Sequence, residues 1–211
     1  MSTIAAGVAT TGHEKHVSDY IGAKVGMWLF LFTELLLFGG LFLVYSVYRA
    51  MYHTDFHTAA KELNVTLGAV NTIILLTSSL TMACSISATQ RGNRKLSILL
   101  LVMTALFGIA FLVNKYFEWG AKFQHGIYPG SDQLGMRENG EILFYGLYYM
   151  MTGLHGLHVI VGVLLFSVVL LFLVKKKIHQ ENFVLIENSG LYWHLVDIIW
   201  IFLFPLFYLI T

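Results

Sequence analysis

Five long apolar stretches constrain the fold of this 211-residue chain more than any other feature of its sequence. A membrane-spanning helix needs about 20 mostly apolar residues, because the hydrocarbon core is about 30 Å thick and a helix rises about 1.5 Å per residue. The stretches that meet this length run over residues 25–48, 65–89, 96–119, 142–174 and 192–210. The sequence therefore predicts an all-α membrane protein with five transmembrane helices.

The composition is also typical of a chain inside a bilayer. Hydrophobic residues make up 57% of the chain and charged residues only 12%, whereas a soluble domain carries about 25% charged residues. The net charge of +1 excludes a strongly basic nucleic-acid-binding protein, so we expect no nucleic-acid partner. The one cysteine, Cys84, cannot form an internal disulfide and is predicted to be a buried, inert thiol.

The positions of Lys and Arg predict the orientation of the chain. Residues 1–24 and the loops after the second and fourth stretches hold eight of them, and the loops after the first and third stretches hold five when Lys115, near the end of the third stretch, is counted with its loop. Because cytoplasmic loops carry the excess of Lys and Arg, we expect a cytoplasmic N-terminus and an outside C-terminus. Residues 1–24 then form a cytoplasmic segment without a signal peptide, followed by one five-helix domain over residues 25–211.

Two acidic residues, Glu34 and Asp197, lie well inside predicted spans. A charge at the bilayer centre costs several kcal/mol, so each carboxyl must face protein, be paired or be neutral. For Glu34 two interpretations stay open: a proton-linked or lipid-facing carboxyl, or a packing carboxyl that hydrogen-bonds a neighbouring helix. Asp197 lies three residues after His194 on one helix face, which predicts a hydrogen bond between them that ties helices together.

His155 and His158 also lie three residues apart on one face of the fourth span. Paired histidines on a helix can bind haem, copper or a di-iron centre. No Cys-rich motif and no Glu-x-x-His run accompanies them, and the nearby Gly153, Gly156 and Gly162 favour close approach of another element. We therefore predict helix packing here and no metal site in this chain.

Residues near the ends of the predicted spans are assigned to the membrane boundary. Glu118 is expected to mark the water boundary of the third span, and Glu187 to lie just before the fifth, where an acid suits a helix N-terminus. The aromatic residues near these ends predict an interfacial belt: Trp28, Trp119, Tyr192, Trp193 and Tyr208.

Several short motifs occur in an order that is typical of one family. They are Gly26-Met27-Trp28-Leu29-Phe30 through Thr33-Glu34 and Phe38-Gly39; Asn71-Thr72; Leu106-Phe107-Gly108 through Phe117-Glu118-Trp119; His155-Gly156-Leu157-His158-Val159; and Glu187 followed by Tyr192-Trp193-His194 and Asp197-Ile198-Ile199-Trp200. From about Lys24 to its C-terminus the chain resembles subunit III of haem–copper terminal oxidases. It resembles the short five-helix bacterial form, which lacks the first two of seven helices.

The resemblance implies a non-catalytic subunit of a respiratory oxidase that reduces oxygen and pumps protons in the bacterial cytoplasmic (inner) membrane. It implies no catalytic residue and no cofactor in this chain, with haem and copper in the partner catalytic subunit. Implied partners are oxidase subunits I and II, phospholipids and, as a further option, a respiratory supercomplex. In that family the subunit binds phospholipid in a cleft between its helices and supports proton uptake and durability during turnover.

The resemblance also carries roles to individual residues. Glu34 matches the family's intramembrane carboxyl and is interpreted, together with Glu118, as a proton-linked or structural carboxyl. Lipid-binding or helix-packing roles are implied for a larger set: His155, His158, Lys175, Lys176, Lys177, Glu187, Trp193, His194 and Asp197. The connection over residues 120–141 is longer than in mitochondrial members, which leaves open the outer partner surface that it covers.

Other functions stay open on the sequence alone. A similar short subunit accompanies nitric oxide reductases and quinol oxidases, so neither the electron donor nor the choice between oxygen and nitric oxide is determined. A small transporter or proton channel that uses Glu34 and the histidines is a third alternative. Five spans do not divide into the two inverted halves that many transporters have, which disfavours it.

Overall fold

A computed structural model describes residues 3–178 and 182–210, with side chains from Ile21 onward. The described chain is built of helices and contains no β-strand. The helices are α1 (Thr3–Met51), α2 (His53–Ala60), α3 (Val65–Gln90), α4 (Arg94–Gln124), α5 (Asp132–Gly135), α6 (Asn139–Val174) and α7 (Val184–Tyr208).

Five of these helices are long and apolar enough to cross a membrane, which confirms the predicted fold class. They are Ile21–Met51 within α1, and the whole of α3, α4, α6 and α7. The helix ends differ from the predicted spans: α4 continues to Gln124 and α7 begins at Val184. Hydropathy marks only the apolar part of a helix, whereas the helix itself continues through polar residues until its backbone hydrogen bonds stop.

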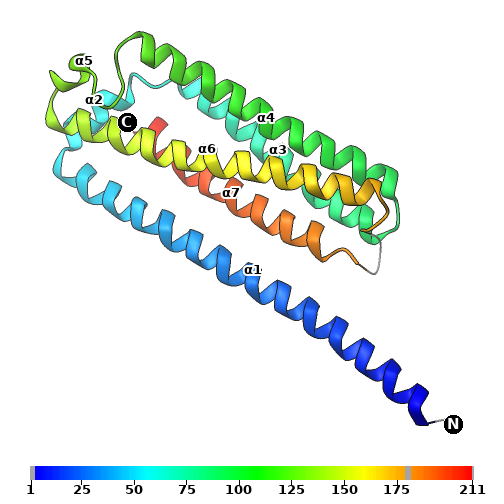
Figure 1. The fold of residues 1–211 in the computed structure, drawn as a ribbon. Coiled ribbons are helices and arrows are strands. Elements are labelled where there is room, and N and C mark those ends of the chain that lie inside the picture. Colours follow the sequence, from blue (N-terminus) through cyan, green and yellow to red (C-terminus); the bar gives the residue numbers. More distant parts are fainter. Residues whose placement is uncertain (1–2, 179–181, 211) are drawn as a thin grey trace.

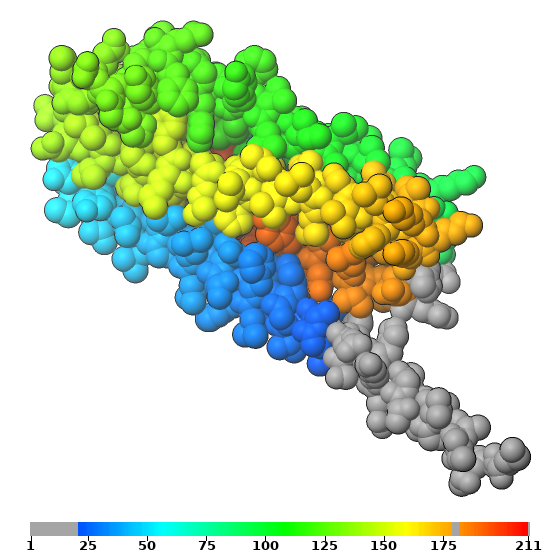
Figure 2. Space-filling model, viewed as in Figure 1, coloured from blue at the N-terminus to red at the C-terminus, as the bar shows by residue number. Residues whose placement is uncertain are grey.

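Four helices form the bundle and the fifth lies along its side (Figure 1). α3 packs against α4, α4 against α6, α6 against α7, and α7 against α3. Among the long helices, α1 contacts α6 and α7, and the short α2 packs against α6. On the face in Figure 2, only a strip of α7 (orange) is visible between α1 (blue) and α6 (yellow), so α7 is the most enclosed helix.

Glycines let the bundle helices approach α7 closely. A Cβ atom built on Gly162 of α6 would lie 2.6 Å from the Trp193 ring, and one on Gly108 of α4 would lie 2.9 Å from it. Trp193 is fully buried, and its ring fills the space that these glycines leave. The predicted close approach at Gly162 is therefore present, whereas Gly156 has no neighbour within 4 Å of such an atom.

Polar side chains of α3 face the bundle, as membrane helices use such residues to bind one another. The Asn114 amide donates to the Asn71 carbonyl at 2.9 Å, and the Thr81 and Thr104 hydroxyls lie 2.8 Å apart. Near the other end, the Thr89 and Ser97 hydroxyls lie 2.7 Å apart. Uncharged polar groups along α3 thus tie it to α4, its neighbour in Figure 1.

Two expectations about exposure are wrong. Trp193, Tyr192 and Tyr208 are buried in the bundle instead of forming an interfacial belt, because the turns of α7 that carry them lie between α3 and α6. Trp28 is exposed, and Trp119 is partly buried. Cys84 is exposed rather than buried, since its side of α3 faces away from the bundle.

Candidate functional site

Glu34 of α1 and His158 of α6 form a polar contact inside the apolar part of the protein. Glu34 Oε2 lies 2.8 Å from His158 Nε2. His158 Nδ1 lies 2.7 Å from the Leu154 carbonyl oxygen, which can only accept, so Nδ1 carries a proton. The contact to Glu34 therefore needs one more proton, held by either the carboxyl or the imidazole, and the pair has no net charge in either form.

Aromatic rings surround this pair and leave its side chains only slightly exposed. Phe38 meets the His158 ring edge-on at 5.5 Å, and the Tyr192 ring stacks on the His158 ring at 6.4 Å between centroids. The Tyr192 hydroxyl donates to the His158 carbonyl oxygen at 2.9 Å. α1, α6 and α7 thus meet at one polar point, and the hydrogen bond to a neighbouring helix that was one interpretation of Glu34 is present.

His155 is directed elsewhere, although it lies only one helical turn from His158. Its ring is fully buried between Phe111, at 5.4 Å, and Trp200, at 5.3 Å. Neither ring nitrogen has a hydrogen-bond partner in the part of the chain that the structure describes. The two histidines therefore do not share a site, and no three His, Cys, Asp or Glu side chains of the described residues gather around a metal position.

The predicted hydrogen bond between His194 and Asp197 is wrong. His194 Nδ1 pairs with the Ser79 hydroxyl of α3 at 2.6 Å. Asp197 is buried, and its carboxyl oxygens have no hydrogen-bond partner of good geometry among the described residues, although Ser79 lies next to it. The surroundings of His194 and Asp197 are therefore determined by the side chains of α3 that face them, and not by the three-residue spacing between them along α7.

The two tryptophans of α7 also form hydrogen bonds with side chains of α3. The Trp193 indole donates to the Ser78 hydroxyl at 2.9 Å, and the Trp200 indole donates to the Thr72 hydroxyl at 3.0 Å. These bonds satisfy two buried donors that would otherwise be costly in an apolar interior. The helix-packing interpretation of Trp193 fits these contacts.

Glu118 does not mark a water boundary, because it is buried in a charged cluster. Glu118 Oε2 accepts from Lys115 Nζ at 3.0 Å, and Glu118 Oε1 accepts from the hydroxyls of Tyr148 and Tyr208 at 2.7 and 2.5 Å. Lys115 Nζ also donates to Tyr208 at 2.8 Å and to Tyr148 at 3.2 Å. α4, α6 and α7 each contribute to this cluster, which ties these three helices together.

Lys115 is a site residue that the sequence interpretation missed, because it was assigned to the outer loop. A signal was present: Lys115, Glu118 and Lys122 follow each other at spacings of three and four, which places them on one helix face. All three are buried. Such a face must find partners in the bundle, since an unpaired buried charge is strongly unfavourable.

The remaining predicted residues lie at the opposite end of the bundle. Glu187 lies in the first turn of α7 and pairs with Lys24 at 2.7 Å. Lys175, Lys176 and Lys177 are exposed in the turn that follows α6. The structure therefore joins Glu34 to His158 but does not bring them together with the lysines or with Glu118.

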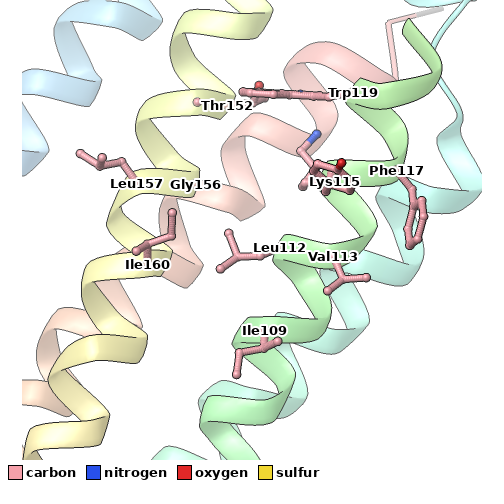
Figure 3. Close-up of a pocket in the computed structure, with 12 residues that line it drawn as sticks. Ile109, Leu112, Val113, Lys115, Phe117, Trp119, Thr152, Gly156, Leu157 and Ile160 are labelled. Atoms are coloured by element: carbon pink, nitrogen blue, oxygen red, sulfur yellow. The ribbon is translucent and has the colours of Figure 1, made fainter. Parts of the chain in front are cut away.

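Two apolar hollows open on the sides of the membrane helices. The larger, about 510 Å³, lies between α4 and α6 (Figure 3) and is lined by aliphatic residues such as Ile109, Leu112 and Ile160, with the Trp119 ring across one end. The second, about 310 Å³, lies between α1 and α7 and includes Trp28 and His194. Both hollows are lined mainly by apolar side chains, against which the hydrocarbon chains of lipids can pack.

The whole chain is similar to proteins of known class. A model of the family described as "Cytochrome c oxidase subunit III" matches residues 3–211. The cytochrome c oxidase subunit 3 of Corynebacterium diphtheriae is 35% identical over 89% of this chain and 87% of its own length, and that of Thermostichus vulcanus is 32% identical over 93% and 92%. A heme-copper oxidase subunit I+III of Aeropyrum pernix is 33% identical over 89% of this chain, a match that takes up 22% of that protein.

Proposed function

The chain belongs to the cytochrome c oxidase subunit III family, and from this premise we propose that it is a non-catalytic core subunit of a haem–copper oxidase in the bacterial inner membrane. The observation that carries the proposal is the family match over residues 3–211. Its partners are then the catalytic subunit I and subunit II. The fused subunit I+III protein of Aeropyrum pernix supports the pairing with subunit I, because it joins the two subunits in one chain.

In this role the chain holds neither haem nor copper, and electron transfer to oxygen takes place in the catalytic subunit. The chain's own residues support a different task. Glu34 and His158 keep a proton in a neutral pair within the membrane, which suits a part in proton uptake. The Lys115–Glu118 cluster holds three helices together, which suits a part in the stability of the complex.

Bound phospholipid is a further part of the proposal. Both hollows lie between membrane helices and are lined almost entirely by apolar side chains. Burial of an acyl chain there is favourable by about 0.8 kcal/mol for each methylene group removed from water, and by less when the alternative is the bilayer. Lipid chains in these hollows would fill the space that the helices leave open.

The orientation with the N-terminus in the cytoplasm gains support from the structure. Lys115 and Lys122 are buried in the bundle and do not belong to an outer connection. The outer connections then retain only Arg49, Lys61 and Arg137. Eight Lys and Arg on the proposed cytoplasmic side then compare with three on the outer side. This ratio agrees better with the rule that Lys and Arg concentrate on the cytoplasmic side.

Co-purification from native membranes tests the proposed function. A tag on this chain, used in mild detergent, should bring down a complex that contains a haem–copper catalytic subunit and consumes oxygen. A complex that reduces nitric oxide, or one that oxidises quinol, would assign the chain to a related enzyme. Recovery of the chain with no haem-containing partner would contradict the proposal.

A further inference from the structure

Ser79 of α3 and His194 and Asp197 of α7 form a second polar group inside the apolar part of the protein. Ser79 Oγ lies 2.6 Å from His194 Nδ1, and the same serine lies next to the Asp197 carboxyl. Asp197 is only 3% exposed, and its side chain forms no ion pair with a described residue. The Ser79 hydroxyl therefore lies beside two ionisable side chains of the facing helix.

The hydroxyl of Ser79 differs from its neighbours in α3 in having no backbone acceptor. A serine or threonine inside a helix can donate to a backbone carbonyl three or four residues earlier. Thr72, Thr77 and Ser78 do so, at 2.9, 2.8 and 2.7 Å. Ser79 makes no such bond with a residue that the structure describes. Its hydroxyl hydrogen is therefore available to the side chains of α7.

The burial of Asp197 determines where the protons of this group lie. Neither carboxyl oxygen has a hydrogen-bond partner of good geometry among the described residues, and an ionised carboxylate without partners is costly in an apolar interior. The favourable form is the protonated carboxyl, which is a donor, and a hydroxyl can accept one hydrogen bond while it donates another. Asp197 can then donate to Ser79 and Ser79 to His194 Nδ1, which leaves the imidazole proton on Nε2.

His194 connects this group to the hollow between α1 and α7. Its side chain is partly exposed and lines the hollow. Its Nε2 atom forms no hydrogen bond with a described residue. Trp28 and Leu191, which also line the hollow, each follow one residue of the Lys24–Glu187 pair by four positions, or about one helical turn. The hollow therefore extends from just inside the end of the bundle that carries this ion pair to His194.

We propose that Ser79, His194 and Asp197 form a proton relay, which holds one proton inside the membrane and exchanges it through the hollow between α1 and α7. For release, the Asp197 proton passes to Ser79 Oγ while the Ser79 hydroxyl proton passes to His194 Nδ1. Nε2 then gives its proton to a water molecule that enters the hollow. One proton has left, the Asp197 carboxylate accepts from Ser79, and neutral His194 donates from Nδ1 to Ser79. Uptake is the reverse sequence.

The relay rests on the proposed part in proton uptake for its role, but its chemistry depends only on these three side chains. It adds a second proton-holding site to the Glu34–His158 pair, in which two side chains share a proton directly. An acyl chain in the same hollow would cover His194, so lipid in this hollow would slow the exchange.

Hydrogen–deuterium exchange followed by infrared spectroscopy tests the relay in the purified complex. A protonated carboxyl has a C=O stretching band separate from the bands of a carboxylate, and this band shifts when deuterium replaces the proton. Asp197→Asn identifies the band of Asp197 by its loss. Ser79→Ala removes the middle of the relay, and Ser79→Thr keeps a hydroxyl there. Thr77→Ala is the matched control, because the Thr77 hydroxyl donates to the Ile73 carbonyl oxygen of its own helix.

We expect Asp197→Asn to remove one protonated-carboxyl band. In heavy water, Ser79→Ala should slow the exchange of that band by on the order of 100-fold, the low end of what a positioned acid or base contributes to a proton transfer. Ser79→Thr and Thr77→Ala should exchange as the unmodified complex does. An unchanged exchange rate in Ser79→Ala, or no band lost in Asp197→Asn, would overturn the proposal.

The haem spectrum of the same preparation reports separately on the proposed function. A preparation without haem would contradict that function, while the carboxyl band could still be followed. A haem-containing complex in which Asp197 exchanges independently of Ser79 would leave the proposed function in place and exclude the relay.

Discussion

Glu34 and His158 share one proton between two helices in the apolar part of the protein. His158 Nδ1 donates to a backbone carbonyl oxygen, so Nε2 and the Glu34 carboxyl must hold the second proton between them. A neutral pair is far less costly in a membrane than a lone carboxylate. A single contact can therefore serve both helix packing and proton exchange, and substitutions are needed to separate the two roles.

Glu34→Ala and Glu34→Gln separate these roles, because glutamine can still donate to His158 but cannot carry a proton. If the contact only packs helices, Glu34→Ala should lower stability by about 0.6 kcal/mol, and at most about 1.7 kcal/mol, while Glu34→Gln has little effect. If the proton matters, both variants should shorten the active lifetime of the oxidase in turnover. Detergent unfolding and repeated-turnover assays measure the two effects, and the haem spectrum should stay unchanged in both variants.

Glu118→Gln should destabilise the protein strongly, although it changes the size of the side chain very little. It leaves the Lys115 ammonium group buried without a counter-charge, and loss of one partner of a buried ion pair costs about 3–5 kcal/mol. Thermal unfolding in detergent measures the loss. Glu138→Gln is a suitable control, because Glu138 is exposed and caps no helix through its side chain; equal stability of both variants would contradict a structural role of the cluster.

At the scale of helices, α7 is held by shape as well as by hydrogen bonds. Its two tryptophans, Trp193 and Trp200, donate to α3 on one side. On another side, Trp193 packs on glycines of α4 and α6. Small residues at helix contacts allow this close approach. Close van der Waals packing then contributes to helix association, because the hydrophobic effect does not drive helices together in lipid.

Gly162→Ala should destabilise the bundle, because the added methyl group would lie 2.6 Å from the Trp193 ring. Overpacking of a filled interior typically costs about 1–3 kcal/mol. Gly146→Ala in the same helix is the matched control, since an added Cβ there meets nothing within 4 Å. We expect the control to unfold at the same temperature as the unmodified chain or slightly above it; a loss of stability at Gly146 equal to that at Gly162 would argue against the contact with Trp193.

At the scale of the whole molecule, the two ends of the bundle differ in how they treat charge. One end exposes several cations that form no ion pair with a described residue, beside the paired Lys24 and Glu187: Arg91, Lys95, Lys175, Lys176 and Lys177. At the other end Arg137 is paired with two carboxylates: its Nη1 contacts Glu62 at 2.8 Å and Glu141 at 3.0 Å, which joins the chain before α3 to the start of α6. The Tyr145 hydroxyl also donates to Glu62, at 2.7 Å.

The Glu62 contacts predict a loss of stability in acid. Burial raises the pKa of Glu62, but hydrogen bonds from Arg137 and Tyr145 and the nearby positive charges outweigh it, so its pKa lies below the usual value. A carboxyl with a lowered folded-state pKa stabilises the protein above its unfolded pKa, about 4.3, and that contribution disappears as the pH falls through the folded value. Unfolding temperatures below about pH 4 should therefore fall less steeply in Glu62→Gln than in the unmodified chain; parallel curves would contradict this.

The sequence by itself determined the number of membrane helices and their order along the chain. These properties depend on the local run of apolar residues along the chain, which is present before any tertiary contact forms. The motifs around Glu34, His155 and His194 were also sufficient to indicate the family, which the comparison of the whole chain confirmed.

Only the tertiary structure decided which polar groups meet. His158 pairs with a carboxyl 124 residues away, His194 binds Ser79 in place of Asp197, and Glu118 is enclosed because tyrosines of α6 and α7 reach it. Such pairings depend on how far each helix is rotated about its axis and which helices become neighbours. Hydropathy and spacing within one helix contain neither quantity, so a buried polar residue could be identified from the sequence, but not its partner.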